Sequence, residues 1–194
     1  MPNWCRTTIT IDCKDEKESK KLHDLIDGWI SSSEIETDFG DRWLGNIVIK
    51  SGINTLEEVE DGTSVRCCGW VECLIRNGST VYVDTGTAGS PMLRMWLDVI
   101  DRYAPDAELT YVAEESECEL YATNDTEYAG MYFIEYADDR DILYDLTEFE
   151  ALSYIEEDLG SSVEGDIKKL SKDFTKSGFG WVYSWEYIPA DEWD

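Results

Sequence analysis

The dipeptide Asn77-Gly78 places the strongest local constraint on the fold of this chain. It separates two runs rich in strand-forming residues, Ser64–Arg76 and Thr80–Thr85. Asn-Gly readily adopts the positive φ angles that a two-residue hairpin loop requires. The sequence therefore predicts a tight antiparallel hairpin at this point.

The segments around the hairpin predict an α+β fold. Further strands are expected at Trp4–Asp12, Trp43–Lys50, Glu108–Ala113 and Ser116–Thr123. Apolar residues at helical spacing predict helices at Asp15–Ile30 and after Ser90, with Ser90 as the N-cap and Pro91 as the first helical residue. This order matches a ferredoxin-like βαββαβ antiparallel sheet with two helices on one face and one strand added. We assign it to a domain spanning 1–123.

Residues 124–194 are expected to form an acidic C-terminal α/β extension packed on that domain. Thr147 and Glu150 have the spacing of a capping box, and Phe149, Leu152, Ile155 and Leu159 would form the apolar stripe of the helix that follows. A strand at Gly130–Ala137, a helix at Val163–Phe174 and a strand at Gly178–Ile188 complete the extension. The last strand would gather Trp181, Tyr183, Trp185 and Tyr187 on one face, for core packing or a protein interface.

The composition indicates a folded protein of the cytoplasm. Hydrophobic residues make up 42% of the chain, with 8 Trp, 11 Tyr and 5 Phe, whereas acidic disordered tails lack aromatic residues. No basic region followed by an apolar run opens the sequence, and no stretch approaches the ~18 apolar residues of a membrane span. We expect the six cysteines to be reduced thiols in a cytosolic protein.

We expect neither a metal nor a cofactor. Cys67, Cys68 and Cys73 are the one close cysteine set, and neighbouring strand residues point to opposite faces, so these thiols would not share a zinc ion. Asp84-Thr85-Gly86 resembles half of an aspartic-protease site, which would need a homodimer to supply a second carboxylate. We therefore assign no catalytic residues and classify the chain as a non-enzyme.

Acidic residues are concentrated in one segment. Between Asp101 and Gly160 there are 19 Asp or Glu against Arg102 and Arg140, a net charge of −17, while the whole chain carries −27. Such a field repels nucleic acid and anionic membranes and attracts basic protein surfaces. We expect the partner to be a basic protein, with no direct contact to nucleic acid or membrane.

Ten carboxylates are the candidate partner-binding residues. Strand residues two apart lie on one face about 6.6 Å apart, a spacing comparable with the ~3.4 Å repeat of DNA phosphates. Glu156, Glu157 and Asp158 lie at the C-terminal end of a predicted helix, where the helix dipole opposes negative charge. Concentration of charge at such an unfavourable position hints at a functional role. The candidates are Glu114, Glu115, Glu117, Glu119, Asp138, Asp139, Asp141, Glu156, Glu157 and Asp158. A solubilising surface and a divalent-cation site are the alternative interpretations of the same residues.

The opening Met1-Pro2-Asn3-Trp4-Cys5 resembles a family of small phage- and plasmid-borne proteins with a ferredoxin-like domain. Thr87, Ser90, Pro91 and Leu97, followed by Tyr103-Ala104-Pro105 and an acidic strand, extend the resemblance. It implies a ferredoxin-like core and a mobile-element origin, and it implies no activity.

Together these features predict a non-enzymatic phage or mobile-element protein. It would inhibit a basic, nucleic-acid-handling host protein, such as a CRISPR effector or a restriction nuclease, by imitating a nucleic-acid backbone. Two alternatives remain open. One is an ordinary mobile-element interaction domain whose charge only confers solubility, and the other is a homodimeric aspartyl hydrolase around Asp84.

Overall fold

The computed structural model describes residues 3–31, 40–53, 67–116, 119–160 and 166–193. The chain divides into two compact units, one formed by 1–120 with 188–194 and the other by 121–187. Both units combine helices with a sheet, so the expected α+β class is confirmed.

Four antiparallel strands form the sheet of the first unit. They are β1 (Trp4–Asp12), β2 (Gly69–Asn77), β3 (Thr80–Ala88) and β4 (Glu108–Glu115), in the spatial order β2-β3-β1-β4. Ile9 in β1 lies opposite Val83 and Tyr111, and all three side chains are buried. The alternating pattern of β1, with every second residue buried, reflects a sheet that is covered on one face.

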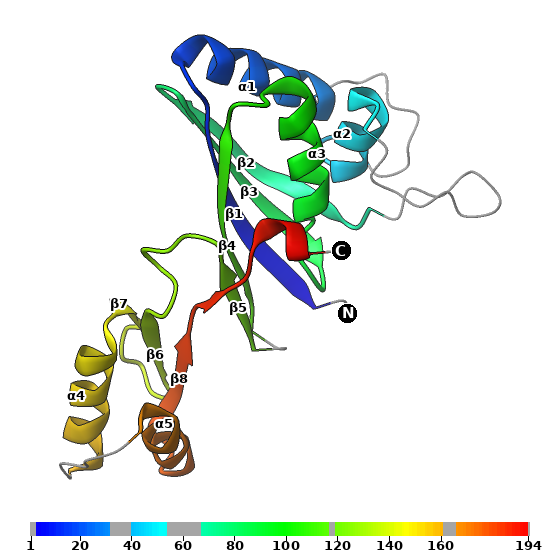
Figure 1. Ribbon diagram of the computed structural model, residues 1–194. Helices are drawn as coiled ribbons and strands as arrows, with labels where there is room; N and C mark the ends of the chain where they lie inside the picture. Colours follow the sequence, from blue (N-terminus) through cyan, green and yellow to red (C-terminus); the bar gives the residue numbers. More distant parts are fainter. Residues whose placement is uncertain (1–2, 32–39, 54–66, 117–118, 161–165, 194) are drawn as a thin grey trace. The chain divides into compact units, whose positions relative to one another are not determined.

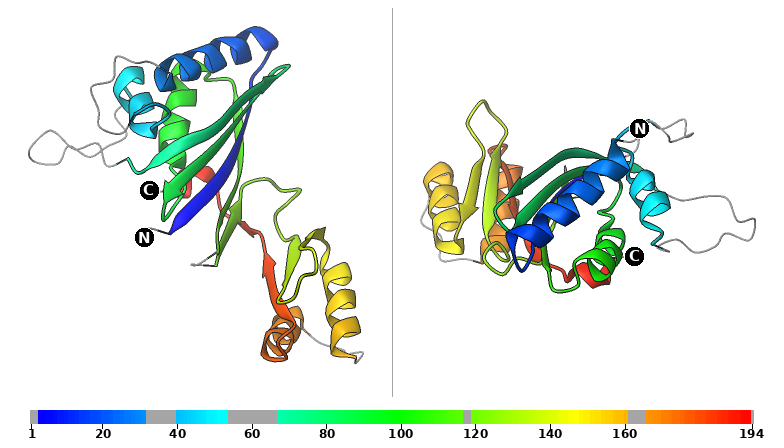
Figure 2. Two further views of the ribbon diagram at one scale, coloured as in Figure 1. Left: turned by 180° about the vertical axis from the view of Figure 1, so that it is seen from behind. Right: turned by 90° about the horizontal axis from the view of Figure 1, so that it is seen from above.

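Three helices cover that face, rather than the two that were expected: α1 (Glu16–Ile30), α2 (Leu44–Ser51) and α3 (Leu93–Tyr103). They lie on one side of the sheet in two views (Figures 1 and 2). Leu22 and Ile26 of α1 and Trp96 of α3 are completely buried. The helices therefore supply the apolar layer that the strands need.

The predicted strand at Trp43–Lys50 is wrong, because this segment forms α2. Its β-branched residues suggested a strand, but Leu44, Ile47 and Ser51 recur at helical spacing and are buried together. Gly52 then ends the helix in the left-handed conformation. A short apolar run satisfies either period, and burial against the neighbouring elements decided the outcome.

The hairpin loop and the start of the helix after Ser90 are both shifted along the sequence from their predicted positions. The hairpin is present, but Asn77 pairs with Thr80, so the loop residues are Gly78 and Ser79, and Gly78 has a φ of 57°. Helix α3 begins later than expected, with Met92 at its N-cap and no side-chain cap. Ser90 is not the cap, and its carbonyl accepts a hydrogen bond from the Thr87 hydroxyl.

The C-terminal residues belong to the first unit, although the sequence placed all of 124–194 in the extension. The 3-10 helix η2 (Ala190–Glu192) lies in this tail. The Tyr111 hydroxyl donates to the Ile188 carbonyl at 2.8 Å and accepts from Nε1 of Trp193 at 2.7 Å. These bonds to β4 explain why the boundary at the end of the chain differs from the expected one.

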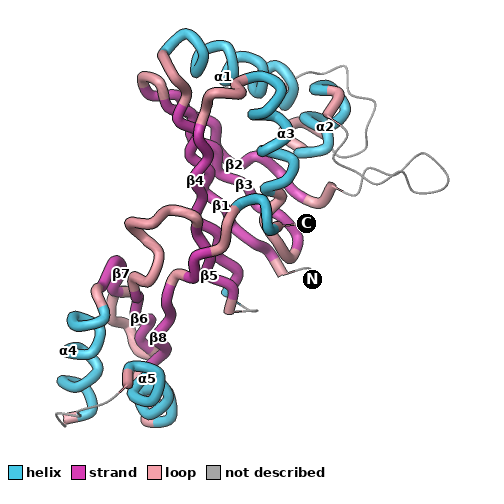
Figure 3. The backbone as a smooth tube through the Cα atoms, viewed as in Figure 1, coloured by secondary structure: helices cyan, strands magenta, loops and turns pink. Residues whose placement is uncertain are grey.

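The second unit is a small sheet with two helices, as Figure 3 shows. Its three-stranded sheet has the order β7-β6-β8, from β6 (Tyr132–Tyr136), β7 (Leu143–Leu146) and β8 (Gly180–Ser184). The helices are α4 (Glu148–Leu159) and α5 (Ile167–Lys176). Residues 121–123 of β5 (Leu120–Thr123) and β9 (Glu186–Tyr187) also lie in this unit, and Ala122 pairs in parallel with Glu186.

The two faces of β6 contribute to different cores. Ile134 and Tyr136 pack with Ile155 of α4 and Phe174 of α5. Phe133 points to the other face, where its ring lies 5.0 Å from that of Tyr183. Trp185 and Tyr121 complete this aromatic cluster.

The expected aromatic strand is interrupted. Trp185 is buried between β8 and β9, while Trp181 and Tyr187 are exposed. The four aromatic side chains therefore do not form one continuous face.

The capping box of α4 is confirmed. The Thr147 hydroxyl oxygen accepts from the Glu150 amide at 3.3 Å, and the Glu150 carboxylate accepts from the Thr147 amide at 2.9 Å. Hydrogen bonds from the Thr147 backbone and side chain lower the pKa of Glu150 below its ordinary value of 4.5. Because this pKa is lowered, the charged cap stabilises the fold above about pH 4.5 and is lost as the pH falls through the folded-state pKa.

Replacing Thr147 by Ala should lower the free energy of unfolding by about 1 kcal/mol, because an orphan helix amide loses its acceptor. The same change should raise the pKa of Glu150 toward 4.5. Chemical denaturation and carboxyl NMR titration measure the two effects. Ser153→Ala on the same helix is the control, since its hydroxyl bonds only to the Phe149 carbonyl. Equal effects of both variants on stability and on the Glu150 pKa would contradict the capping account.

Candidate functional site

The most distinctive surface of the second unit is a pocket with acidic and aromatic walls, which we call the acidic pocket. It has a volume of about 390 Å³. Three segments line it: the end of β6, the connection from β6 to β7 with the start of β7, and the last two turns of α4. The lining residues are Tyr136, Arg140, Asp141, Leu143, Tyr154, Glu157 and Asp158.

Local backbone chemistry positions the cation of the pocket. Asp138 follows β6 directly, and its carboxylate accepts a hydrogen bond from the Arg140 amide at 3.0 Å. This bond across two residues is an Asx turn, which folds the connection back on itself. The turn directs the Arg140 side chain toward α4.

Arg140 joins the connection to α4. Its Nε lies 3.0 Å from Oδ1 of Asp138, and one terminal nitrogen lies 2.8 Å from Oδ1 of Asp158. Its guanidinium carbon lies 3.6 Å from the centre of the Tyr136 ring, within the range of a cation–π contact. One planar cation therefore satisfies two carboxylates and an aromatic face at once.

These contacts change the protonation equilibria of the site. The Arg140 hydrogen bonds lower the pKa of Asp138, and the two carboxylates raise the pKa of Arg140. Burial, reinforced by the charge of Asp158, raises the pKa of Tyr136 to about 12. Around neutral pH, Arg140 is therefore charged and Tyr136 is a neutral phenol.

The remaining carboxylates of the acidic pocket are available to a partner. Asp141 and Glu157 are exposed, and neither forms an ion pair with any residue that the structure describes. With Asp158 they give three negative charges against the single positive charge of Arg140. A pocket with this balance attracts cations and repels phosphate groups.

The structure groups six of the ten candidate carboxylates in two neighbouring segments of the second unit. Asp138, Asp139 and Asp141 lie in the connection, and Glu156, Glu157 and Asp158 lie in the last turn of α4. Arg140 links Asp138 to Asp158, while Asp141, Glu157 and Asp158 line the acidic pocket. Asp139 is exposed beside them, and Glu156 is half-buried.

The expected row of carboxylates along a strand is wrong. Strand β4 ends at Glu115, which is only 2% exposed because it shares the buried face of β4 with Tyr111 and Ala113. Glu114 is half-buried. Glu119 occupies a turn with a φ of 55°, before β5 begins. Glu117 lies outside the described residues.

Sequence reasoning missed the residues that organise the pocket. Arg140 was counted only as one of two opposing charges, and Tyr136 and Tyr154 were not singled out. The Asp-x-Arg spacing of 138–140 is a signal for the Asx turn. Arg140 also contacts Asp158, which lies 18 residues further along the chain. No pattern of neighbouring residues predicts a contact over that distance in the sequence.

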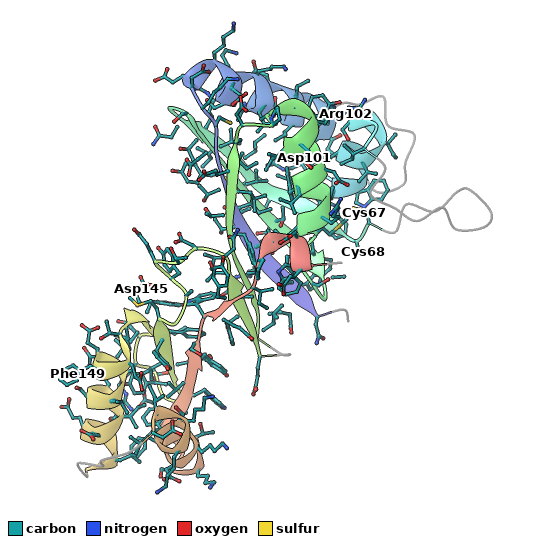
Figure 4. The ribbon with its side chains drawn as sticks, in the orientation of Figure 1. Cys67, Cys68, Asp101, Arg102, Asp145 and Phe149 are labelled. Atoms are coloured by element: carbon teal, nitrogen blue, oxygen red, sulfur yellow. The ribbon has the colours of Figure 1, made fainter. Side chains whose placement is uncertain are left out.

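Phe149 also departs from the expected pattern. The sequence placed it in the apolar stripe of α4, but it is 78% exposed, and Ala151 and Ile155 are the buried residues of this helix. Figure 4 shows Phe149 on α4 and Asp145 in β7, close to the start of the helix. The exposed ring lies between Glu148 and Glu150 in the first turn of α4, and Phe149 does not line the acidic pocket.

Other candidate sites show structural roles. Asp84 lies within β3 and accepts a hydrogen bond from the Thr8 hydroxyl at 2.9 Å, and the strand continues to Ala88. Cys67 is buried with its sulfur 3.4 Å from that of Met92, while Cys68 is exposed. Within the described ranges, no three His, Cys, Asp or Glu side chains are arranged to hold a metal ion.

Comparisons of this chain with protein-family models, with curated proteins and with solved structures gave no match. Among the helices that the structure describes, none has the length and apolar character required to span a membrane.

Replacing Arg140 by Gln should raise the pKa of Asp138 toward its ordinary value of 3.8, because the carboxylate loses its charged donor while the amide of residue 140 still bonds to it. Stability should change little, since Asp138 and Arg140 are exposed to solvent. Carboxyl NMR titration of the variant tests this. Arg94→Gln, which removes a cation paired with Asp98, is the matched control. An Asp138 pKa that is unchanged in Arg140→Gln would show that the guanidinium does not lower it.

Proposed function

We propose that this chain is a non-enzymatic binding protein that attaches to a basic, nucleic-acid-handling host protein through the acidic surface of its second unit. One observation carries the proposal. Exposed carboxylates from two segments of that unit are grouped around a pocket in which Asp141 and Glu157 have no described cationic partner. A cationic nucleic-acid-binding groove is the protein surface most complementary to such a group.

The charge of the second unit supports this proposal. Residues 121–187 contain 16 acidic and 5 basic residues, a net charge of −11. Four of those basic residues are the exposed lysines of α5, namely Lys168, Lys169, Lys172 and Lys176. Arg140 is the fifth and is already paired. The segment containing the connection and α4 is therefore strongly anionic, and it would occupy a nucleic-acid channel by imitating the phosphate backbone.

The ferredoxin-like assignment of the first unit is part of the proposal. The order β2-β3-β1-β4 and the antiparallel pairing support it. The opening Met1-Pro2-Asn3-Trp4-Cys5 supports a phage or mobile-element origin through its resemblance to proteins of such elements. Under this origin, a host defence nuclease such as a CRISPR effector or a restriction enzyme is the expected target.

A second candidate function is an ordinary interaction domain whose charge confers solubility. The observation that favours it is the first unit, which carries a net charge of −16 over its own residues. Negative charge is thus not confined to the candidate surface. In the first candidate function, partner binding depends on particular carboxylates. In the second, only the total number of negative charges affects the behaviour of the chain.

Capture from a bacterial lysate separates these candidates. At low salt the chain should retain proteins with cationic nucleic-acid-binding grooves, and retention should fall steeply as salt is added. The double variant Asp141→Asn/Glu157→Gln should retain them at least about tenfold more weakly, which corresponds to ~1.4 kcal/mol. It leaves the contacts of Arg140 with Asp138 and Asp158 in place.

The control is Asp101→Asn/Glu108→Gln, which removes the same charge from exposed positions of the first unit. It should retain the partners as the unmodified chain does. Equal weakening by both double variants would favour plain charge over a specific surface. Recovery of only abundant proteins without basic grooves would overturn the proposal.

A further inference from the structure

We infer that the acidic pocket is a receptor for one guanidinium group, supplied by an arginine side chain of the partner protein. This inference rests on the proposed function, and it names the chemical group that the surface recognises. It goes beyond general charge attraction because the pocket combines carboxylates, an aromatic ring and an apolar wall in one cavity.

The contacts of Arg140 show how this part of the molecule accommodates a guanidinium. The group lies on the ring of Tyr136 and directs its N–H donors to Asp138 and Asp158. Stacking on an aromatic face and forked hydrogen bonds to carboxylates are the two contacts that favour arginine over lysine. The connection and α4 thus already bind one arginine of the chain itself.

A second set of the same groups remains beside Arg140. Tyr154 is 40% exposed, and together with Asp141 and Glu157 it lines the part of the pocket that Arg140 does not fill. Leu143 adds an apolar wall, against which the aliphatic stem of an arginine can lie. The volume of about 390 Å³ lies within the range of small-ligand pockets and is sufficient for one such side chain.

The charge balance of the pocket favours a cationic ligand. Three carboxylates and Arg140 are among the lining residues, so the lining carries a net charge of −2 before binding and −1 after a guanidinium enters. A guanidinium is therefore favoured over a neutral urea group of the same shape, because only the charged group offsets the carboxylates. A phosphate-bearing ligand is excluded for the same reason.

NMR titration of the full chain at low ionic strength tests the inference. N-acetyl-arginine methylamide should shift the ring resonances of Tyr154 and the Nε–H resonance of Arg140, with a dissociation constant of about 1 mM or less. N-acetyl-lysine methylamide should bind more weakly, because an ammonium neither stacks on a ring nor forms forked hydrogen bonds. The neutral isostere N-acetyl-citrulline methylamide should cause no saturable shift.

Two pocket variants and one control locate the binding. Glu157→Gln and Tyr154→Leu should each weaken arginine binding at least about fivefold, through loss of a carboxylate and of a stacking face respectively. Glu127→Gln removes an exposed carboxylate of the same unit outside the pocket and should leave binding unchanged. Equal binding of the lysine or citrulline probe, or no effect of Glu157→Gln, would overturn the inference.

The outcome can be separated from that of the proposed function. If basic proteins are captured from the lysate but the arginine probe does not bind, the guanidinium receptor is wrong and the proposed function stands. If the probe binds in the pocket but no protein with a basic groove is captured, the proposed function is wrong and the receptor stands.

Discussion

The fork that Arg140 forms between Asp138 and Asp158 is the interaction on which the candidate surface depends. It links the connection after β6 to the last turn of α4 across a ring of the core, Tyr136. Each exposed ion pair contributes little stability alone. Their importance is geometric, because one cation holds together two anionic segments that would otherwise repel each other.

The last turn of α4 is an energetically unfavourable place for carboxylates. Glu156, Glu157 and Asp158 lie at the negative end of the helix dipole, and the last turn contains no basic residue. Arg140 offsets part of this repulsion from outside the helix, while the capping box and the left-handed Gly160 fix where α4 begins and ends. Such an arrangement lowers the stability of the free chain, and binding of the proposed cationic partner would offset this cost.

Local signals predicted part of the fold. The hairpin at Asn77-Gly78, the helix after Asp15 and the capping box at Thr147 each depend on a few adjacent residues, and all are present. Helix α2 was predicted as a strand because its short apolar run Ile47-Val48-Ile49 fits both the strand and the helix period, and only burial against other elements distinguishes them.

The candidate site was predictable in composition but not in arrangement. The count of acidic residues identified the connection from β6 to β7 and the end of α4 as candidate binding segments. It also selected Glu115, whose burial follows from the register of β4 against β1, a long-range pairing. Arg140 was missed because its partner in α4 is distant in the sequence, and a contact between distant segments leaves no periodic signal.

The most direct measurement of the central claim is competition between this chain and nucleic acid for one purified partner captured from the lysate. Fluorescence anisotropy of a labelled duplex or guide RNA bound to that partner would be followed as the chain is added. If the acidic surface imitates a nucleic-acid backbone, the chain should displace the labelled strand completely, and the Asp141→Asn/Glu157→Gln variant should need about tenfold more protein. A ternary complex in which chain and nucleic acid are bound together would contradict the account.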